Sequence, residues 1–325
     1  MKKLLSVLLV LSMIFVFASC GKTVEEPKVK TNVFMISGPT GVGAVNLMNA
    51  DENGTAKGDY NFTVVASPTE IVSKISNKEA DIAAVATNMA SSIYNKTNGG
   101  VTVLAVNTLG VLNVLTNKGT EITSLSELKG KTIYTTGQGA NPEYVINYLL
   151  SKNGINPATD VNIQFKAEGT ELVPVWATEP DAVIIAPQPV ATSIISKYEG
   201  SKLAIDLTDE WEKLDDNSAL MMGCIIVRNE FLNENKSAVE LFLKEYEESI
   251  KKVSGDIDTT AALCEKYGII AKAALAKKAI PNCNVCFITG AEMKAKLSGY
   301  LNVLFDADSK SIGGKLPQES FYYAE

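Results

Sequence analysis

Short runs of β-branched and aliphatic residues alternate along this chain with segments whose apolar residues follow a helical spacing. Parallel strands need a crossover between them, usually a helix, so this alternation predicts β-α units whose helices cover a mostly parallel sheet. The predicted strands of a first set are 32–36, 62–65, 81–85 and 101–106. Those of a second set are 131–135, 162–165 and 181–186, with helices expected at 142–150 and 189–197. The predicted fold class is therefore α/β, with two lobes.

The pattern changes after residue 216. A predicted strand at 220–227 precedes a long amphipathic helix, and further helical segments run from Thr259 to about Phe305. The apolar face of the long helix is formed by Val239, Phe242, Leu243, Tyr246, Ile250 and Val253. A helical tail of this kind needs a sheet to cover, and we expect it to pack on the first lobe.

The chain is long enough to form two hydrophobic cores. It has 325 residues, of which 46% are hydrophobic, and at this size one core usually divides into two. We expect the chain to leave the first lobe near 107–113 and to return near 219–224, which would make a hinged clamshell. The predicted parts are 31–110 plus 217–325 for lobe one and 111–216 for lobe two.

The first twenty residues have the composition of an export leader. Two lysines precede an apolar run from Leu4 to Phe17, which is too short to span about 30 Å of hydrocarbon. Two small residues then precede Cys20, and this ending resembles a bacterial lipobox, apart from Phe17 where Leu is usual. We expect 1–19 to be a signal peptide and 20–30 to be a polar tether that begins at an acylated Cys20. The protein would then be extracytoplasmic and anchored to the bacterial cell membrane; a plain secretory signal is the alternative.

The amino-acid composition excludes several kinds of site. The sequence has no histidine, which removes the usual general base and the commonest zinc ligand. Its one arginine, Arg228, is expected near the hinge, so a guanidinium clamp on a ligand is disfavoured. The net charge of −7 offers no basic face for nucleic acid. Because no nucleophile is paired with a base, we expect neither an enzyme nor a cofactor.

A glycine-rich motif, GPTGVG at 38–43, follows the first predicted strand. It matches the start of a nucleotide-binding P-loop, but Ala44 and Val45 stand where that loop needs Lys and Ser or Thr. What remains is a turn whose amides, with those of the next helix, can approach a small polar or anionic group; a tight turn without a ligand is the alternative. The candidate ligand-binding residues of this loop are Pro39, Thr40, Gly41 and Val42.

Other polar loops follow predicted strands in both lobes. In open α/β sheets, ligands bind beyond the carboxyl ends of the strands, so these loops should converge on one cleft. The candidate ligand-binding residues there are Ser67, Thr69, Asn88, Thr136, Gly137, Gln138 and Gln188. After Gly137 we expect a helix capped by Asn141, with Pro142 at its first position.

Two of these candidates have a purely structural alternative. Ser67, with Pro68 and Glu70 after it, has the pattern of a capping box, in which its hydroxyl would cap the next helix. Asn88 can cap the helix that runs through Tyr94.

Several blocks of the sequence resemble a known family. They are VFMISGPTGVG, EIVSKISNKEADIAAVATNMA, LSELKGKTIYTTGQGANPEYVINYLLSKNGI and DAVIIAPQPVATSII. Together with the leader they resemble type II periplasmic-type binding proteins, in the branch that takes up nitrate, sulfonates, taurine or thiamine-pyrimidine precursors through ABC importers. The resemblance implies a two-lobe clamshell with two hinge crossings, a small-molecule ligand between the lobes, and an ABC permease with its ATPase as partners. We expect a monomer.

The family resemblance also implies which loops touch the ligand. The matching positions are Thr40, Gly41, Thr69, Asn88, Gly137, Gln138 and Gln188. Related chains often carry Glu-Pro where this one has Gln188 and Pro189, so a charged contact is missing here. Combined with the composition, the family resemblance favours a sulfonate-like anion held by helix amides or a neutral, pyrimidine-like heterocycle. A surface sensor or adhesin with the same fold is the alternative function.

Trp176 and the cysteines outside the leader leave further alternatives open. Trp176 either stacks on a planar ligand or lies in the core. Cys283 and Cys286 have the spacing of a redox pair or half a zinc site, without a second such pair. We expect no metal site; with Cys224 and Cys264, these residues are interpreted as buried free thiols or as containing one disulfide.

Overall fold

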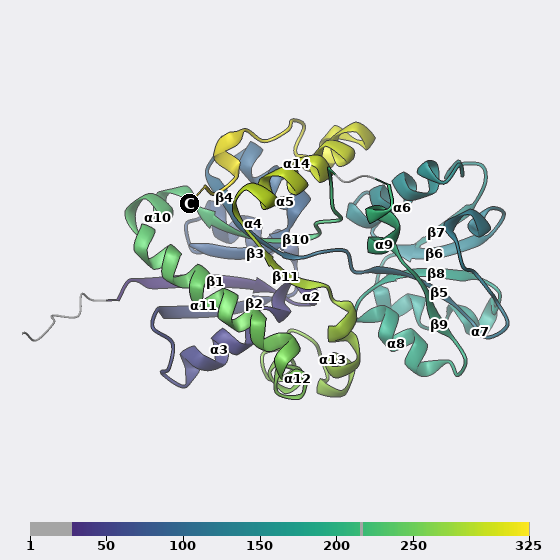
Figure 1. Ribbon diagram of the computed structural model, residues 1–325, viewed down its shortest axis with the longest axis horizontal. Helices are drawn as coiled ribbons and strands as arrows, with labels where there is room; N and C mark the ends of the chain where they lie inside the picture. The colour runs from purple at the N-terminus through teal and green to yellow at the C-terminus, as the bar shows by residue number, and fades with distance from the viewer. Residues whose placement is uncertain (1–27, 215–216, 325) are drawn as a thin grey trace, which may run out of the picture.

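The structure is a computed structural model that describes residues 28–214 and 217–324 (Figure 1). The expected signal peptide, Cys20 and most of the expected tether lie outside the described residues. The chain forms two α/β lobes that lie side by side, each built on one sheet. None of the helices in the described part of the chain combines the length and the apolar character needed to span a bilayer.

The first lobe is built on a six-stranded mixed sheet in the order β11-β4-β10-β3-β1-β2. Its strands are β1 (Lys30–Ile36), β2 (Asp59–Val65), β3 (Ile82–Ala86), β4 (Val101–Thr108), β10 (Gly223–Arg228) and β11 (Val285–Ile288). β1 pairs in parallel with β2 and β3, and β10 runs antiparallel between β3 and β4. All five strands that the sequence predicts for this lobe are confirmed.

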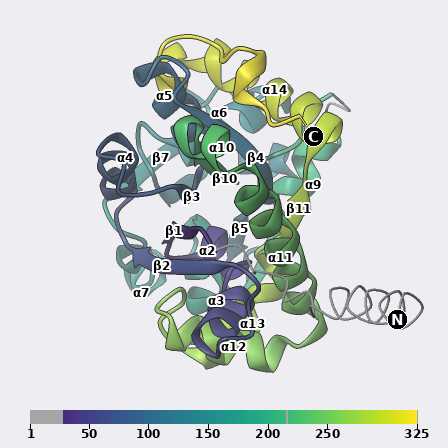
Figure 2. The ribbon, with the colours of Figure 1, turned by 90° about the vertical axis from the view of Figure 1, so that its left-hand side faces the viewer.

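Helices cover both faces of this sheet, which explains why its strands are apolar on both sides. Alternate side chains of β1 point to opposite faces: Val33 and Met35 pack with α3, α11 and α12, whereas Phe34 packs with α4, α5 and α14. Figure 2 shows α5 and α14 on one side of the sheet and α3 and α12 on the other. The helices of this lobe are α2 (Pro39–Val42), α3 (Val45–Glu52), α4 (Pro68–Ser76), α5 (Thr87–Lys96), α10 (Asn229–Glu234), α11 (Lys236–Gly255), α12 (Ile257–Lys266), α13 (Ala273–Ala279) and α14 (Gly290–Ala307). Short 3-10 turns follow at η3 (Ile280–Asn282), η4 (Ser309–Ile312) and η5 (Glu319–Phe321).

The second lobe is built on a five-stranded sheet in the order β7-β6-β8-β5-β9. Its strands are β5 (Leu112–Thr116), β6 (Thr132–Thr136), β7 (Asn162–Lys166), β8 (Val183–Pro187) and β9 (Lys202–Asp206). Its helical segments are η1 (Leu125–Leu128), α6 (Asn141–Lys152), η2 (Gly169–Leu172), α7 (Val175–Thr178), α8 (Val190–Lys197) and α9 (Leu207–Glu212). The chain passes between the sheets after β4 and before β10, as predicted for a fold with two crossings.

One hydrophobic cluster runs through the joint between the lobes. Its residues come from α5 and α14 of the first lobe and from α6 and α9 of the second. In this cluster Trp211 of α9 packs edge-on against Tyr300 of α14, with ring centroids 5.4 Å apart. It also packs at a tilt against Tyr148 of α6, with centroids 4.6 Å apart. The indole nitrogen of Trp211 donates to the Ser218 hydroxyl (2.9 Å) in the returning crossing. These aromatic rings therefore join both lobes and one crossing.

Three strands have no counterpart in the sequence prediction. β5 is buried along its whole length and lies in the segment that the sequence suggests is the crossing. β9 and β11 are short strands at sheet edges, and none of the four β11 residues is fully buried. Their hydrophobic patterns are too brief to separate them from loop or helix. The long helix is confirmed: α11 buries all six residues of the predicted apolar face.

The expected position of Arg228 is wrong. Arg228 ends β10 and pairs with Val101 at the start of β4, so it lies at the edge of the sheet opposite the crossings. There its Nη2 donates to the Asp81 carboxylate (2.8 Å), whose other oxygen accepts from the backbone and side-chain nitrogens of Asn32. The one guanidinium of the chain is therefore part of the first lobe's framework.

Trp176 and the cysteines take structural roles. Trp176 is buried and donates to the Ala182 carbonyl (2.7 Å), which confirms the core interpretation and makes ligand stacking wrong. Cys224, Cys264, Cys283 and Cys286 carry free thiols. In the ranges 28–214 and 217–324, no group of three or more cysteine or acidic side chains is arranged to hold a metal ion.

Replacing Arg228 with methionine is expected to lower the free energy of unfolding by about 3 kcal/mol, because it leaves the buried Asp81 carboxylate without its charged partner. Urea unfolding followed by circular dichroism measures the change. The matched control is Lys251→Met, which breaks an exposed ion pair on α11 and should leave the midpoint unchanged. Equal midpoints for the two variants would contradict this account of the Arg228–Asp81 pair.

Candidate functional site

The carboxyl ends of the parallel strands in both sheets meet where the lobes join. In the first sheet, β1, β3 and β4 run in one direction and end next to the crossings. In the second sheet, β6 and β8 run in parallel and end beside the amino end of β5, where the first crossing arrives. Figure 1 shows α2 on the side of the first lobe that faces the second lobe. The loops after these strands form the candidate ligand site.

The GPTGVG loop forms the first part of this site. Pro39 and Thr40 are half-buried, whereas Gly41 and Val42 are buried. A Cβ on Gly41 would lie 2.4 Å from the Ile36 carbonyl oxygen, so close packing requires glycine there. α2 is one turn long, and its few aligned peptides add little dipole. The predicted amide cradle therefore depends on individual N–H groups more than on a helix dipole.

The buried amide of Asn107 holds this loop in place. Its Nδ2 donates to the Thr40 carbonyl and to the Tyr246 hydroxyl, both at 2.8 Å, and its Oδ1 accepts from Thr108 (3.2 Å). Asn107 is only 1% exposed. Burial raises the pKa of Tyr246, so its hydroxyl stays neutral. Asn107 thus ties the loop to α11 and to the end of β4, where the chain leaves the first lobe.

The start of α5 holds the returning crossing. Thr87 donates from its hydroxyl to the Met221 carbonyl (2.6 Å) and from its backbone to Met222 (3.2 Å). The Asn88 amide donates to the Ser311 carbonyl in η4 (3.3 Å). The predicted capping role of Asn88 is wrong, because the helix is capped at Ala86 and the Asn88 amide bonds outside α5.

Ser67 and Thr69 lie apart from the crossings. They follow β2, an edge strand separated from β10 by β1 and β3, and both are exposed. Ser67 occupies the cap position of α4, but its hydroxyl bonds to the Thr69 hydroxyl (2.8 Å) and caps no backbone amide. The predicted capping box is therefore wrong, and both residues are exposed at the edge of the first lobe.

The loop after β6 forms the second-lobe wall. Thr136 and Gly137 are half-buried and Gln138 is exposed. Gly137 and Gly139 have positive φ angles, 82° and 71°, which favour glycine. α6 is capped at Ala140, so the prediction that Asn141 caps this helix is wrong by one position, and the Asn141 side chain makes no capping bond.

Gln188 is an enclosed polar side chain among the predicted ligand contacts. It is 2% exposed, its Nε2 donates to Asn113 (3.0 Å), and its Oε1 accepts from the Thr192 hydroxyl (2.7 Å). Its backbone N–H donates to the Val111 carbonyl (3.0 Å) in the first crossing. The hydrogen bonds of the side chain are therefore made within the second lobe, and its contact with a ligand stays a prediction.

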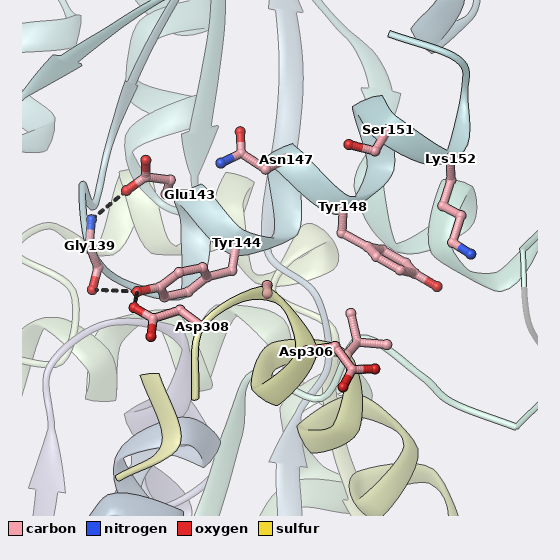
Figure 3. A pocket seen from close by; sticks show the side chains of 11 residues that line it. Gly139, Glu143, Tyr144, Asn147, Tyr148, Ser151, Lys152, Asp306 and Asp308 are labelled. Atoms are coloured by element: carbon pink, nitrogen blue, oxygen red, sulfur yellow. Dashed lines mark hydrogen bonds between the residues drawn. The ribbon is translucent and has the colours of Figure 1, made fainter. Parts of the chain in front are cut away.

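A pocket of about 760 Å³ lies between α6 of the second lobe and α14 of the first (Figure 3). Gly139, next to the predicted contact Gln138, lines it. Tyr144 of α6 and Asp308 after α14 point toward one another across it, and the Tyr144 hydroxyl donates to Asp308 Oδ2 (3.1 Å). Partial burial and the Asp308 carboxylate raise the pKa of Tyr144. The sequence analysis missed this contact, which joins the lobes beside the β6 loop.

Comparison with known proteins extends this description. The model of the family described as "NMT1/THI5 like" matches residues 56–256. By sequence, no curated protein matches the chain.

Solved structures share the fold at low sequence identity. An ABC transporter protein from Parabacteroides distasonis has a TM-score of 0.76 at 20% identity, covering 91% of this chain and 99% of its own. The periplasmic aliphatic sulphonate-binding protein SsuA from Escherichia coli has a TM-score of 0.70 at 11% identity. The match covers 92% of this chain and 94% of that protein. The alkanesulfonate-binding protein SsuA from Xanthomonas axonopodis pv. citri, bound to MOPS, has a TM-score of 0.63 at 10% identity. The match covers 91% of this chain and 98% of that protein. The fold is that of two-lobe periplasmic binding proteins.

Replacing Asn107 with alanine is expected to lower the free energy of unfolding by about 2 kcal/mol and to speed amide hydrogen exchange in residues 38–43. The reason is that the Thr40 carbonyl and the Tyr246 hydroxyl lose their shared donor. Exchange followed by mass spectrometry measures the loop directly. Asn95→Ala, which removes two hydrogen bonds to the C-terminal segment, is the matched control and should leave 38–43 protected. Unchanged exchange in the Asn107 variant would contradict the proposed role.

Proposed function

Since the chain belongs to the NMT1/THI5-like family, we propose that it is an extracytoplasmic solute-binding protein that delivers a small molecule to an ABC importer. The observation that carries this proposal is that three segments at the candidate site are hydrogen-bonded to the crossings or to the strand end where a crossing begins. Thr40 is bonded to Asn107, Thr87 to Met221, and Gln188 to Val111. A solute that orders these segments would therefore also favour one relative orientation of the two lobes. A binding protein that closes over its ligand requires this coupling.

The proposed ligand is held without arginine or histidine. Arg228 is engaged with Asp81 at the opposite edge of the first sheet. The polar groups of the predicted ligand contacts are side-chain amides, hydroxyls and backbone N–H groups. Such a site suits a sulfonate-like anion or a pyrimidine-like heterocycle. The two SsuA structures support the first class, because their names describe sulfonate binding.

We propose binding without chemical turnover. Among the thiols of the first lobe, burial raises the pKa of Cys264, Cys283 and Cys286 to about 12. Near neutral pH they are therefore protonated, and a protonated thiol is a poor nucleophile. No imidazole is present to activate a hydroxyl.

A binding protein of this kind should be stabilised by its solute and should release it unchanged. A thermal-shift screen of sulfonates, pyrimidines and amino acids is expected to find one class that raises the melting temperature. At a solute concentration of a hundred times Kd, the free energy of unfolding should increase by about 2.7 kcal/mol. Small-angle scattering with that solute should report a smaller radius of gyration. Recovery of a chemically altered solute by mass spectrometry would refute the proposal, as would the absence of any stabilising solute.

We infer the lipid anchor from the leader sequence alone. β1 begins at Lys30, ten residues after Cys20, so an extended tether would reach about 33 Å from the membrane. The monomeric protein would then dock on its permease at the outer face of the cytoplasmic membrane, while the ATPase, the further partner, acts on the permease from the cytoplasmic face.

Metabolic labelling with a fatty-acid probe is expected to tag the wild-type protein and to leave Cys20→Ser untagged, because the thiol is the proposed acylation site. Gel fluorescence measures the label, and immunoblotting of the same gel shows that both proteins are produced. Equal labelling of the two would rule out acylation at Cys20.

A further inference from the structure

One buried side chain at the lobe junction has no hydrogen-bond partner among residues 28–214 and 217–324. Asn141 is the first residue of α6, directly after the loop that follows β6, and it is 5% exposed. Both its Oδ1 and its Nδ2 are buried without a hydrogen bond. Among the described residues, it is the one side chain with two buried polar atoms left unpaired.

Other buried amides of the site are paired. Asn107 uses both ends of its side chain, and so does Gln188. Buried polar groups in native proteins nearly always have partners, and an exception requires an explanation such as a water, an ion or a ligand. The missing partner of Asn141 has to offer both an acceptor for Nδ2 and a donor for Oδ1.

The neighbours of Asn141 place it where the lobes meet. Gly139, two residues before it, lines the pocket between α6 and α14. Tyr144, three residues after it, is bonded to Asp308 of the first lobe (Figure 3). The first turn of α6 is therefore part of the junction that the proposed function assigns to the ligand.

The charge around this helix start disfavours an anion. The Glu143 carboxylate already accepts the Gly139 N–H (2.6 Å), so an acidic group occupies the position where a bound anion would be stabilised. Asp308 of the first lobe, which accepts from the Tyr144 hydroxyl, adds a second carboxylate. A sulfonate or carboxylate would satisfy Nδ2 but would leave Oδ1 facing a group with no hydrogen to donate.

We propose that Asn141 selects a neutral ligand that carries an acceptor beside a donor, such as a primary amide, a lactam or the edge of an amino-substituted heterocycle. An asparagine amide makes this pair of bonds with the N7 and N6 edge of adenine, so the geometry is available to it. The inference rests on the proposed function and deepens it, because it chooses between the two ligand classes that the other residues leave open.

The first test measures ligand choice with the full-length protein in detergent. Isothermal titration uses three neutral probes, cytosine, nicotinamide and 2-pyrrolidinone, and three anions, ethanesulfonate, methanesulfonate and nitrate. We expect at least one neutral probe to bind, and Asn141→Ala to weaken that binding at least tenfold. Asn162→Ala, at the exposed amino end of the edge strand β7, is the matched control and should bind as the wild type does.

The outcomes separate the inference from the proposed function. Binding of anions alone, or neutral binding that Asn141→Ala leaves intact, overturns the inference and leaves solute binding standing. Failure of all six probes to bind counts against both.

A second variant tests the unpaired amide without any ligand. Asn141→Leu replaces the side chain with an apolar one of similar size, so the ligand-free protein is expected to unfold at a higher urea concentration than the wild type. The same variant should lose the neutral probe. A lower midpoint for Asn141→Leu would mean that the amide is already paired in the free protein, and would overturn the inference.

Discussion

The hydrogen bonds of one buried amide connect the GPTGVG loop of the first lobe to the strand end from which the chain crosses to the second lobe. Asn107 lies one residue before the end of β4, and its Nδ2 binds both the Thr40 carbonyl and the Tyr246 hydroxyl. Without that donor, the GPTGVG loop would lose its link to the strand from which the chain leaves the lobe. Equivalent links at Thr87 and Gln188 attach the other loops to the same two crossings. Loop position and lobe position are therefore set by a shared group of bonds.

Most of the fold could be predicted from the sequence because its signal is local. The β-branched runs that form β1 to β4 and β6 to β8 are bounded by clear turns and are separated by helical spacing. β5, β9 and β11 are defined by their pairing with distant strands, and nothing in their few residues signals those partners. The error over Arg228 has the same origin, since only the antiparallel direction of β10 places it far from the crossings.

The candidate site could be predicted in outline but not in detail. The rule that ligands bind beyond the carboxyl ends of strands selects loops that, apart from the one after β2, lie near the crossings. It does not say which of their side chains already have hydrogen-bond partners. Gln188 has the position of a ligand contact and is paired inside its own lobe. Asn141 has the sequence context of a cap, and a helix start displaced by one residue leaves its amide unpaired. Hydrogen-bond partners of this kind depend on tertiary contacts that no local pattern contains.

The aromatic rings at the joint make the two tryptophans of this chain unequal as optical reporters. Trp176 is enclosed in the second lobe against Tyr198, and its surroundings do not involve the first lobe. Trp211 is packed between Tyr148 and Tyr300, which come from different lobes. Because the chain has only these two indoles, a change in fluorescence during a titration would originate at the joint. The intrinsic fluorescence of Trp211 can therefore report changes in interlobe geometry without an attached dye.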